Sequence, residues 1–485
     1  MKRGTLIALG AFAVLLVLVL ATREPRVSVG VRRLELPRLD KAQVTALELS
    51  GARNVTLRKE GEGWTVVDPA KPDAKHVADE SLVTGAIEAL GEVKNPDHVT
   101  DRSEKLAEYE LDDAKGLKLK VVHGGGAPVE LVLGKDARNG GVYLRKAGSN
   151  DVFAFQGRLG WSVRKDVKDW RKRQLVSAKV EDVSQLTVRS KDGESVTVKA
   201  GSGPGEWSLA EGTVAPAGFR FSALAAQQLA QQLVSLHAQD FLEGDAAADS
   251  ATGLGEAHDS VEAQLKDGKK VMVHLGKEAS GAVAARLDGD AQVYGLPQYS
   301  AAQLRKRLAD FRDLGLFAFE APKVTKLKVQ ADGKTVVVAK ENGAWKVTEP
   351  KKLPEGFEFE PAQVDGQLGW LSSLRATRLV EGAVTDAQAG LGSPAALVEV
   401  TVEGGAVHTL RLGKATPTAG ERYARSSLDA LTYAVSDSVR STLAQGMDLF
   451  KRRPPPNFAG LQGLESLPPE VRQQFEARLR AAQGQ

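Results

Sequence analysis

The sequence contains no cysteine among its 485 residues. This absence excludes disulfide bonds, thiolate metal sites, a catalytic cysteine and a lipid-modified amino-terminal cysteine. Any attachment to a membrane must therefore be made by the chain itself. The lack of cysteine fits a reducing or an oxidising compartment equally well.

An excess of charge of either sign is also missing. Lys and Arg number 65, and Asp and Glu number 62. A dedicated nucleic-acid-binding protein normally shows a strong basic excess, so we expect no nucleic-acid partner. The chain is too long for a single hydrophobic core, and several domains are expected.

Motifs that would carry a reaction or hold a ligand are absent as well. The seven histidines include no pair four residues apart and no His-Glu-x-x-His pattern, so nothing in the sequence points to a zinc site. No Gly-x-Ser-x-Gly elbow is present. Asp288 and Asp290 flank Gly289 in a pattern that favours a hairpin turn over a calcium loop. The sequence therefore assigns no catalytic, cofactor-binding or metal-binding residue, and no cofactor.

What the sequence does contain is one unit that occurs three times. Its first landmark is a tryptophan after a glycine-rich turn: Trp64, Trp207 and Trp345. Its second landmark is the tripeptide Leu-Gly-Lys, centred on Gly134, Gly276 and Gly413. These glycines follow the tryptophans by 70, 69 and 68 residues. Two landmarks that recur at a nearly constant spacing in all three copies indicate an internal triplication.

Two further marks fall into the same register. A leucine precedes each of these glycines by 22 or 23 residues: Leu111, Leu254 and Leu391. An aspartate with an apolar residue after it follows by 34 or 35 residues: Asp169-Trp170, Asp310-Phe311 and Asp448-Leu449. The first two copies continue with Arg171 and Arg312, whereas the third copy lacks an arginine at this position.

Alternation of apolar and polar residues predicts β-strands in each copy. The predicted strands cover 44–49, 54–57, 64–67, 117–122 and 129–133, then 185–188, 196–198, 261–265 and 271–275, and finally 324–329, 335–338, 397–402 and 409–412. Apolar residues at helical spacing predict one packed helix per copy, within 82–93, 224–236 and 364–374. A basic helix over about 159–173 is expected to close the first copy.

The expected fold class is therefore α+β: an N-terminal transmembrane helix and three tandem repeats, each an antiparallel β-meander with a packed helix and a closing basic helix. The expected divisions are an anchor or signal-anchor at 1–22, a linker at 23–43, repeats at 44–179, 180–321 and 322–453, and a Pro-rich tail with a short helix at 454–485. The tail helix would be docked on its own domain or would bind a partner.

Residues 4–22 form a run of 19 residues without a charge. At about 1.5 Å per residue this run is just long enough to cross the hydrocarbon core of a lipid bilayer. The alternative is a signal peptide that is cleaved after Ala21. We expect a single-pass anchor in the cytoplasmic membrane with its N-terminus inside, because Lys2 and Arg3 precede it. The bulk of the chain would then be extracytoplasmic, in the periplasm.

The landmarks themselves have structural explanations. Leu-Gly-Lys lacks the earlier glycine and the following Ser or Thr of a phosphate-binding loop. We expect its leucine to end a buried strand, its glycine to permit a positive φ in the next turn, and its lysine to be solvated. The three tryptophans could stack on sugars, but their equivalent positions predict that each one fills the core of its own copy.

These features together resemble the bacterial domain-of-unknown-function family 4340. The resemblance covers most of residues 1–450 and is best in the first copy, at Trp64, Tyr109-Glu110-Leu111, Gly134, Tyr143 and Asp169-Trp170-Arg171. It implies a membrane-anchored protein that partners the membrane subunits of an ABC transporter of the gliding-motility type. It implies no catalytic residues.

The expected function is that of a membrane-anchored, extracytoplasmic, non-enzymatic accessory, scaffold or binding protein, associated with an ABC transport complex and with the bilayer through residues 4–22. Two alternatives remain open. One is a cell-envelope hydrolase whose site is assembled between repeats. The other is a glycan-binding module that uses the tryptophans, which full burial of all three would exclude.

Overall fold

The computed structural model describes residues 32–452, apart from Arg38, Gly125 and Ser280. The predicted membrane segment 4–22, the cleavage point after Ala21 and the predicted tail 454–485 lie outside the described residues. Within the described part of the chain, no helix is both long enough and apolar enough to cross a membrane.

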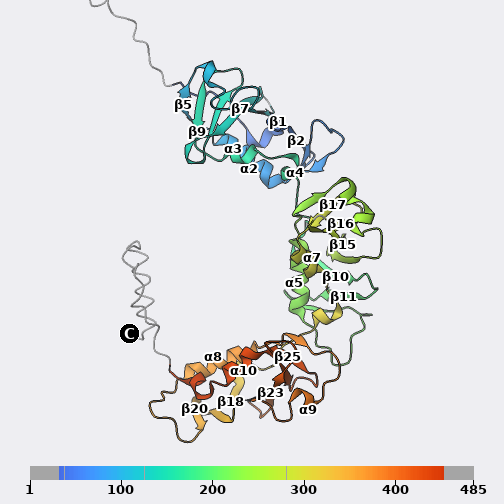
Figure 1. Cartoon of the computed structure of the whole chain (residues 1–485), viewed down its shortest axis with the longest axis vertical. Coiled ribbons are helices and arrows are strands. Elements are labelled where there is room, and N and C mark those ends of the chain that lie inside the picture. The colour runs from blue at the N-terminus through green and yellow to red at the C-terminus, as the bar shows by residue number, and fades with distance from the viewer. Residues whose placement is uncertain (1–31, 38, 125, 280, 453–485) are drawn as a thin grey trace, which may run out of the picture. The chain divides into compact units, whose positions relative to one another are not determined.

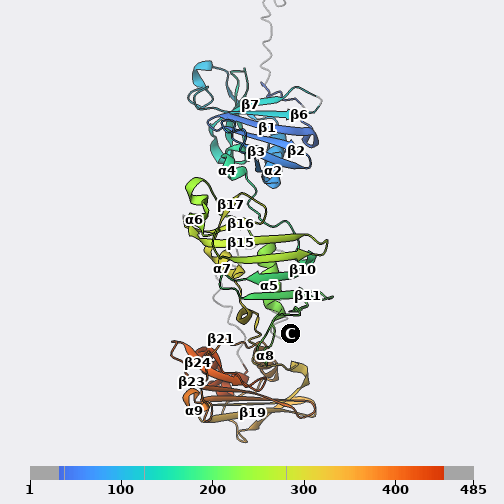
Figure 2. The ribbon, with the colours of Figure 1, turned by 90° about the vertical axis from the view of Figure 1, so that its right-hand side faces the viewer.

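The described residues form three antiparallel sheets with short helices, so the fold is mixed α+β (Figure 1). The strand orders are β4-β3-β2-β1-β6-β7-β8-β9-β5, β12-β11-β10-β14-β15-β16-β17-β13 and β20-β19-β18-β22-β23-β24-β25-β21. Apart from the extra edge strand β4, the three orders are the same. Figure 2 shows β2, β1, β6 and β7 of the first sheet side by side. The predicted repetition is thus present in the sheets.

We call the parts of the chain that carry these sheets repeats 1, 2 and 3. Repeat 1 contains β1 Val44–Gly51, β2 Val55–Glu60, β3 Gly63–Val67, β4 His76–Val77, α2 Glu80–Gly91, β5 Asp97–Thr100, β6 Leu117–His123, β7 Val129–Asp136, β8 Val142–Lys146, β9 Val152–Phe155, α3 Leu159–Val163 and α4 Val167–Trp170. Repeat 2 contains β10 Val183–Arg189, β11 Ser195–Ala200, β12 Trp207–Leu209, α5 Ala223–Val234, β13 Asp240–Leu242, α6 Asp249–Thr252, β14 Asp259–Leu265, β15 Lys270–Ala279, β16 Ala282–Leu287, β17 Val293–Leu296, α7 Gln298–Leu304 and the 3₁₀ turn η6 Leu308–Phe311. Repeat 3 contains β18 Val324–Ala331, β19 Lys334–Glu341, β20 Ala344–Glu349, α8 Pro361–Ser372, β21 Arg378–Leu379, α9 Asp386–Ala389, β22 Ala396–Val402, β23 Val407–Ala415, β24 Glu421–Ser426, β25 Tyr433–Ser436, α10 Asp437–Leu443 and the 3₁₀ turn η8 Gly446–Phe450.

The contacts within the chain define two compact units. The first unit holds the described residues up to Asp182 together with Gln231–Glu262 and Lys269–Arg305. The second unit holds Val183–Ala230, Ala263–Gly268 and the described residues from Lys306 onward.

The packed helix of repeat 1 shows how the sequence pattern produces the core. The side chain of Asp79 caps α2 by accepting hydrogen bonds from the backbone N–H groups of Ser81 and Leu82, at 2.9 and 3.3 Å. A cap of this kind stabilises a helix by about 1 kcal/mol. The helix then buries the apolar face that its spacing predicted against the sheet: Val83, Ala86, Ile87 and Leu90.

The predicted helices of repeats 2 and 3 are also present, as α5 and α8. In α8 the spacing holds throughout, and Val364, Leu368 and Leu371 are buried. In α5 the prediction is wrong for Leu224, whose surface is 53% exposed, whereas Leu229 and Leu233 are buried. Leu224 lies in the first turn of α5, where its side chain faces solvent instead of the core.

The closing segment of repeat 1 differs from the prediction of one basic helix over 159–173. It forms two short helices, α3 and α4, with Arg164 at a non-helical ψ of 60° between them. The break is stabilised by a second cap, because the Asp166 backbone N–H donates to the carboxylate of Asp169 at 3.2 Å. The basic residues of this segment therefore do not share one helical face.

Each repeat ends on an aromatic residue that is fully buried: Trp170, Phe311 and Phe450. The carbonyl of each one accepts a hydrogen bond from the residue just before the packed helix, from Asp79 at 2.7 Å, Ser222 at 2.7 Å and Glu360 at 2.9 Å. The alignment of Asp448-Leu449 with Asp169-Trp170 is therefore wrong by one position. Phe450 is the equivalent residue, and Lys451 takes the place of Arg171 and Arg312.

The landmark tryptophans are core residues in two repeats. Trp64 and Trp345 are each 7% exposed and belong to the hydrophobic cores of repeats 1 and 3. Trp207 differs, because it lies on the edge strand β12 and is only partly buried. The prediction of a core position for all three tryptophans therefore holds for Trp64 and Trp345 alone.

The glycine of Leu-Gly-Lys has a different role from the predicted one. Gly134, Gly276 and Gly413 lie inside strands and have no positive φ. A Cβ at these positions would stand 2.0, 2.2 and 1.9 Å from a backbone carbonyl oxygen, of Tyr109, Thr252 and Ala389 respectively. Each carbonyl lies two residues before the landmark leucine. Close approach of two backbone segments, and not turn geometry, explains why glycine recurs here.

Candidate functional site

The linker after repeat 1 is hydrogen-bonded on both of its sides. Toward repeat 1, the Lys172 N–H donates to the carbonyl of Val77 at 2.9 Å. Toward repeat 2, the Leu175 N–H donates to Leu236 at 2.9 Å, and Arg173 accepts from the Ala238 N–H at 2.8 Å. We call residues 171–176 and the segments that contact them the first junction.

The linker after repeat 2 has the same pattern. The Asp313 N–H donates to the carbonyl of Arg220 at 2.7 Å. The Leu316 N–H then donates to Leu374 at 3.0 Å, and Leu314 accepts from the Ala376 N–H at 2.8 Å. Residues 312–317 and the segments that contact them form the second junction. The two junctions thus use the same backbone scheme with different side chains.

Arg171 is the most deeply buried cation of the first junction, with a side chain only 4% exposed. Its guanidinium donates to the carboxylate of Glu243 and to the side-chain carbonyl of Gln292, both at 2.5 Å. The same group lies 3.9 Å from the ring centroid of Phe241, within cation–π range. One arginine from repeat 1 is therefore held by three residues of repeat 2.

A hollow of about 480 Å³ lies beside Arg171. It is lined by His76, Asp290 and Tyr294, among others. Burial raises the pKa of the Tyr294 phenol above its ordinary value, and so does the carboxylate of Asp290, which accepts its hydrogen bond at 2.8 Å. Burial also lowers the pKa of His76, and the charge of Arg171 lowers it further. The hollow therefore favours a neutral imidazole and a neutral phenol.

His76 gives this junction a pH dependence with a definite sign. Because its pKa is lower in the folded protein than the ordinary value of about 6.5, the unfolded chain binds protons more readily. We expect its contribution to stability to be complete above about pH 6.5 and to be lost as the pH falls below that value. The change in the urea midpoint between pH 7.5 and 5.5 should be smaller in H76Q than in the wild type. An identical change in both proteins would show that His76 plays no part.

The second junction contains a different, partly buried cation, Arg220. Its guanidinium lies 3.2 Å from Asp313, 3.1 Å from Asp429 and 2.8 Å from the carbonyl of Gly315. Burial alone would lower the pKa of Arg220, but Tyr433 and the two carboxylates raise it above its ordinary value. The permanent charge of Arg220 thus joins segments that are up to 213 residues apart in the sequence.

Arg312, the equivalent of Arg171, lacks the partners that Arg171 has. Its guanidinium lies 4.6 Å from the ring centroid of Phe219, and its buried Nη1 has no hydrogen-bond partner among the described residues. A hollow of about 620 Å³ adjoins it, lined also by Glu381 and Tyr423. A buried donor without a partner costs about 1–3 kcal/mol, so Arg312 contributes less to its junction than Arg171 does.

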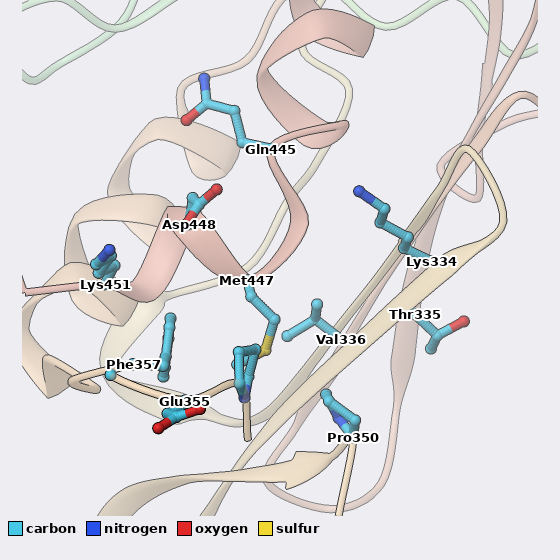
Figure 3. Close-up of a pocket in the computed structure, with 12 residues that line it drawn as sticks. Lys334, Thr335, Val336, Pro350, Glu355, Phe357, Gln445, Met447, Asp448 and Lys451 are labelled. Carbon is cyan, nitrogen blue, oxygen red and sulfur yellow. The ribbon is translucent and has the colours of Figure 1, made fainter. Parts of the chain in front are cut away.

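A third hollow, of about 480 Å³, lies in repeat 3 beside Lys451 (Figure 3). The start of β19, the loop over 350–357 and η8 enclose it. Figure 3 shows the side chain of Met447 pointing toward Val336. Lys334, Glu355, Asp448 and Lys451 are the charged residues of the lining, which therefore carries charges of both signs. This hollow lies near the end of repeat 3, the last repeat of the described residues.

Among the described residues, no group of three or more His, Asp or Glu side chains could hold a metal ion. Reasoning from the sequence assigned no site residue. It also did not predict the contact of Arg171 with Glu243 and Gln292, which are 72 and 121 residues away in the chain. The one sequence feature that could have pointed to this contact is the arginine that recurs after Asp-Trp and Asp-Phe. It also missed two histidines 16 residues apart that come into contact, His258 and His274.

The comparisons with known proteins give one match. A family model described as Domain of unknown function (DUF4340) matches residues 64–257, 253–394 and 345–454. No curated protein and no solved structure matches the chain. The three matched ranges begin in different repeats, in agreement with the three similar sheets.

Proposed function

Since the chain belongs to the family Domain of unknown function (DUF4340), we propose that it is a non-enzymatic, membrane-anchored accessory or scaffold protein. Its bulk is extracytoplasmic, in the periplasm, and residues 4–22 anchor it in the cytoplasmic membrane. Its partners are the membrane subunits of an ABC transporter. The proposal of a transporter partner is based on the family resemblance. The proposal of an anchor is based on the uncharged run of residues 4–22.

The observation that carries the scaffold role is the way the linkers are held. Both linkers are hydrogen-bonded to the repeat before and to the repeat after them. Each junction also holds a cation among partners from more than one segment, Arg171 buried and Arg220 partly buried. A linker that only tethered two domains would be a solvated, flexible chain. Linkers held in this way suit a protein that presents successive surfaces to a partner.

The test is affinity capture of the full-length protein from its own cells in mild detergent, with mass spectrometry of the captured proteins. We expect transporter membrane subunits to co-purify. Deletion of residues 1–22 or of residues 454–485 should abolish the capture if the contact lies in the membrane or in the tail. Retained capture in both deletions would place the contact on the repeats.

The absence of any membrane protein from the wild-type capture would contradict the accessory role. The soluble body would then be assayed against a panel of cell-envelope glycans and peptides, because the hydrolase alternative predicts turnover there. Location has a separate test. Protease added to intact spheroplasts should digest the repeats, and protection of the repeats would contradict an extracytoplasmic body.

A further inference from the structure

Two histidines of repeat 2, which we call the histidine pair, are in direct contact. His258 lies just before β14, and His274 lies within β15. The Nε2 of His258 is 2.9 Å from the Nδ1 of His274, and the two ring planes are 73° apart. Both side chains are partly buried.

The outer nitrogen of His258 fixes the tautomer of that ring. Its Nδ1 lies 2.6 Å from the carbonyl oxygen of Glu256. A carbonyl oxygen can only accept, so Nδ1 carries the proton and donates it. In a neutral His258 the lone pair is therefore on Nε2, the nitrogen that lies beside His274.

The outer nitrogen of His274 lies near a second acceptor. Its Nε2 is 3.5 Å from a carboxylate oxygen of Asp288. If a neutral His274 carries its proton on Nδ1, the lone pair of Nε2 faces the Asp288 carboxylate. If the proton is on Nε2, two lone pairs face each other across 2.9 Å. The first tautomer makes an ordinary N–H···N bond between the two rings, since the Asp288 carboxylate is 74% exposed and can be solvated. The second tautomer leaves both inner lone pairs for a bound cation.

We propose that the histidine pair binds one divalent transition-metal ion, with His258 Nε2 and His274 Nδ1 as its two protein ligands. Metal–imidazole bonds are about 2.0–2.1 Å long, so adjacent nitrogens in a square-planar complex are about 2.9 Å apart. That separation matches the observed one, and square-planar geometry is preferred by Cu²⁺ and Ni²⁺. Water would fill the remaining coordination positions.

The surroundings of the pair are those of metal-ligating histidines. Such histidines usually donate their other ring N–H to a backbone carbonyl or a carboxylate. Here the Glu256 carbonyl accepts from His258, and the Asp288 carboxylate lies 3.5 Å from Nε2 of His274. Arg286 is the cross-strand neighbour of His274, and its positive charge would disfavour a bound metal ion. Its guanidinium is held 3.1 Å from the carboxylate of Asp249, which offsets its charge.

The experiment is a calorimetric titration of the untagged full-length protein with Ni²⁺ or Cu²⁺ in a buffer that does not bind metals. The chain has no cysteine, so no thiolate competes for the metal. We expect one equivalent to bind and H258Q and H274Q each to lose that equivalent. The matched control is H237Q, because His237 Nδ1 makes the same 2.6 Å contact with the carbonyl two residues earlier but has no second imidazole. H237Q should bind as the wild type does.

A spectroscopic readout on the wild type covers the case in which a variant fails to fold. Electron paramagnetic resonance of one equivalent of Cu²⁺ should show hyperfine coupling to two imidazole nitrogens. The proposal is overturned if the wild type binds no metal, if H237Q loses the equivalent as well, or if the copper spectrum shows no imidazole nitrogen.

Discussion

Replacement of Gly413 by alanine should destabilise repeat 3 by about 3 kcal/mol or more, beyond the usual cost of inserting one methyl group into a packed core. The new Cβ would stand 1.9 Å from the carbonyl oxygen of Ala389. That oxygen belongs to the backbone, which cannot rotate away as a side chain would. Relief therefore requires β23 to separate from the segment before Leu391. We expect a lower urea midpoint and faster hydrogen exchange in β22–β24.

The matched control is Gly366→Ala in α8 of the same repeat. A Cβ there meets nothing within 4 Å, and the residue is inside a helix. Alanine is a better helix former than glycine by about 1 kcal/mol, so G366A should be neutral or stabilising. G134A and G276A should behave as G413A does, because their carbonyl contacts are equivalent. Equal effects of G413A and G366A would contradict the close-approach explanation.

Replacement of Arg171 by leucine should destabilise the first junction by about 2 kcal/mol. Removal of one partner from a fully buried ion pair costs about 3–5 kcal/mol when the other charge stays buried. Here the Glu243 side chain is 64% exposed and can be solvated again, which lowers the cost. The lost contact with Phe241 adds to it. Hydrogen exchange of the amides in residues 172–176 should rise with the fall in the urea midpoint.

The comparison variant is R312L in the second junction. Arg312 makes no ion pair among the described residues and leaves one buried nitrogen without a partner. Its replacement should therefore cost less than that of Arg171, and the N–H groups of Leu316 and Ala376 should keep their protection. A larger loss in R312L than in R171L would show that the ion pair of Arg171 does not stabilise the first junction.

The family and the repeated plan of the chain could be obtained from the sequence because they depend on local features. Strand alternation and the apolar face of α8 are set by residues near one another. The family resemblance used the same landmarks, and the family model matches from residue 64 to residue 454.

The roles of single landmarks could not be obtained in the same way. Gly413 is required by the carbonyl of Ala389, the last residue of α9, which lies against β23. Phe450, and not Leu449, is the closing residue because its carbonyl accepts the hydrogen bond of the Glu360 N–H and because Lys451 after it pairs with Phe359. Leu449 and Phe450 are both buried, so this backbone pairing, and not the distance from the previous landmark, identifies the equivalent residue. Spacing along the sequence aligned Asp448 with Asp169, whereas the residue equivalent to Asp169 is Leu449, one position later.

The sequence by itself determined three similar α+β sheets, the packed helices and the family, because periodicity and turn chemistry act over a few residues. Only the tertiary structure decided which distant groups meet: Arg171 with Glu243, and His258 with His274. These contacts join different strands and linkers. Their geometry is fixed by how the sheets and linkers pack, and no spacing rule along the chain encodes it.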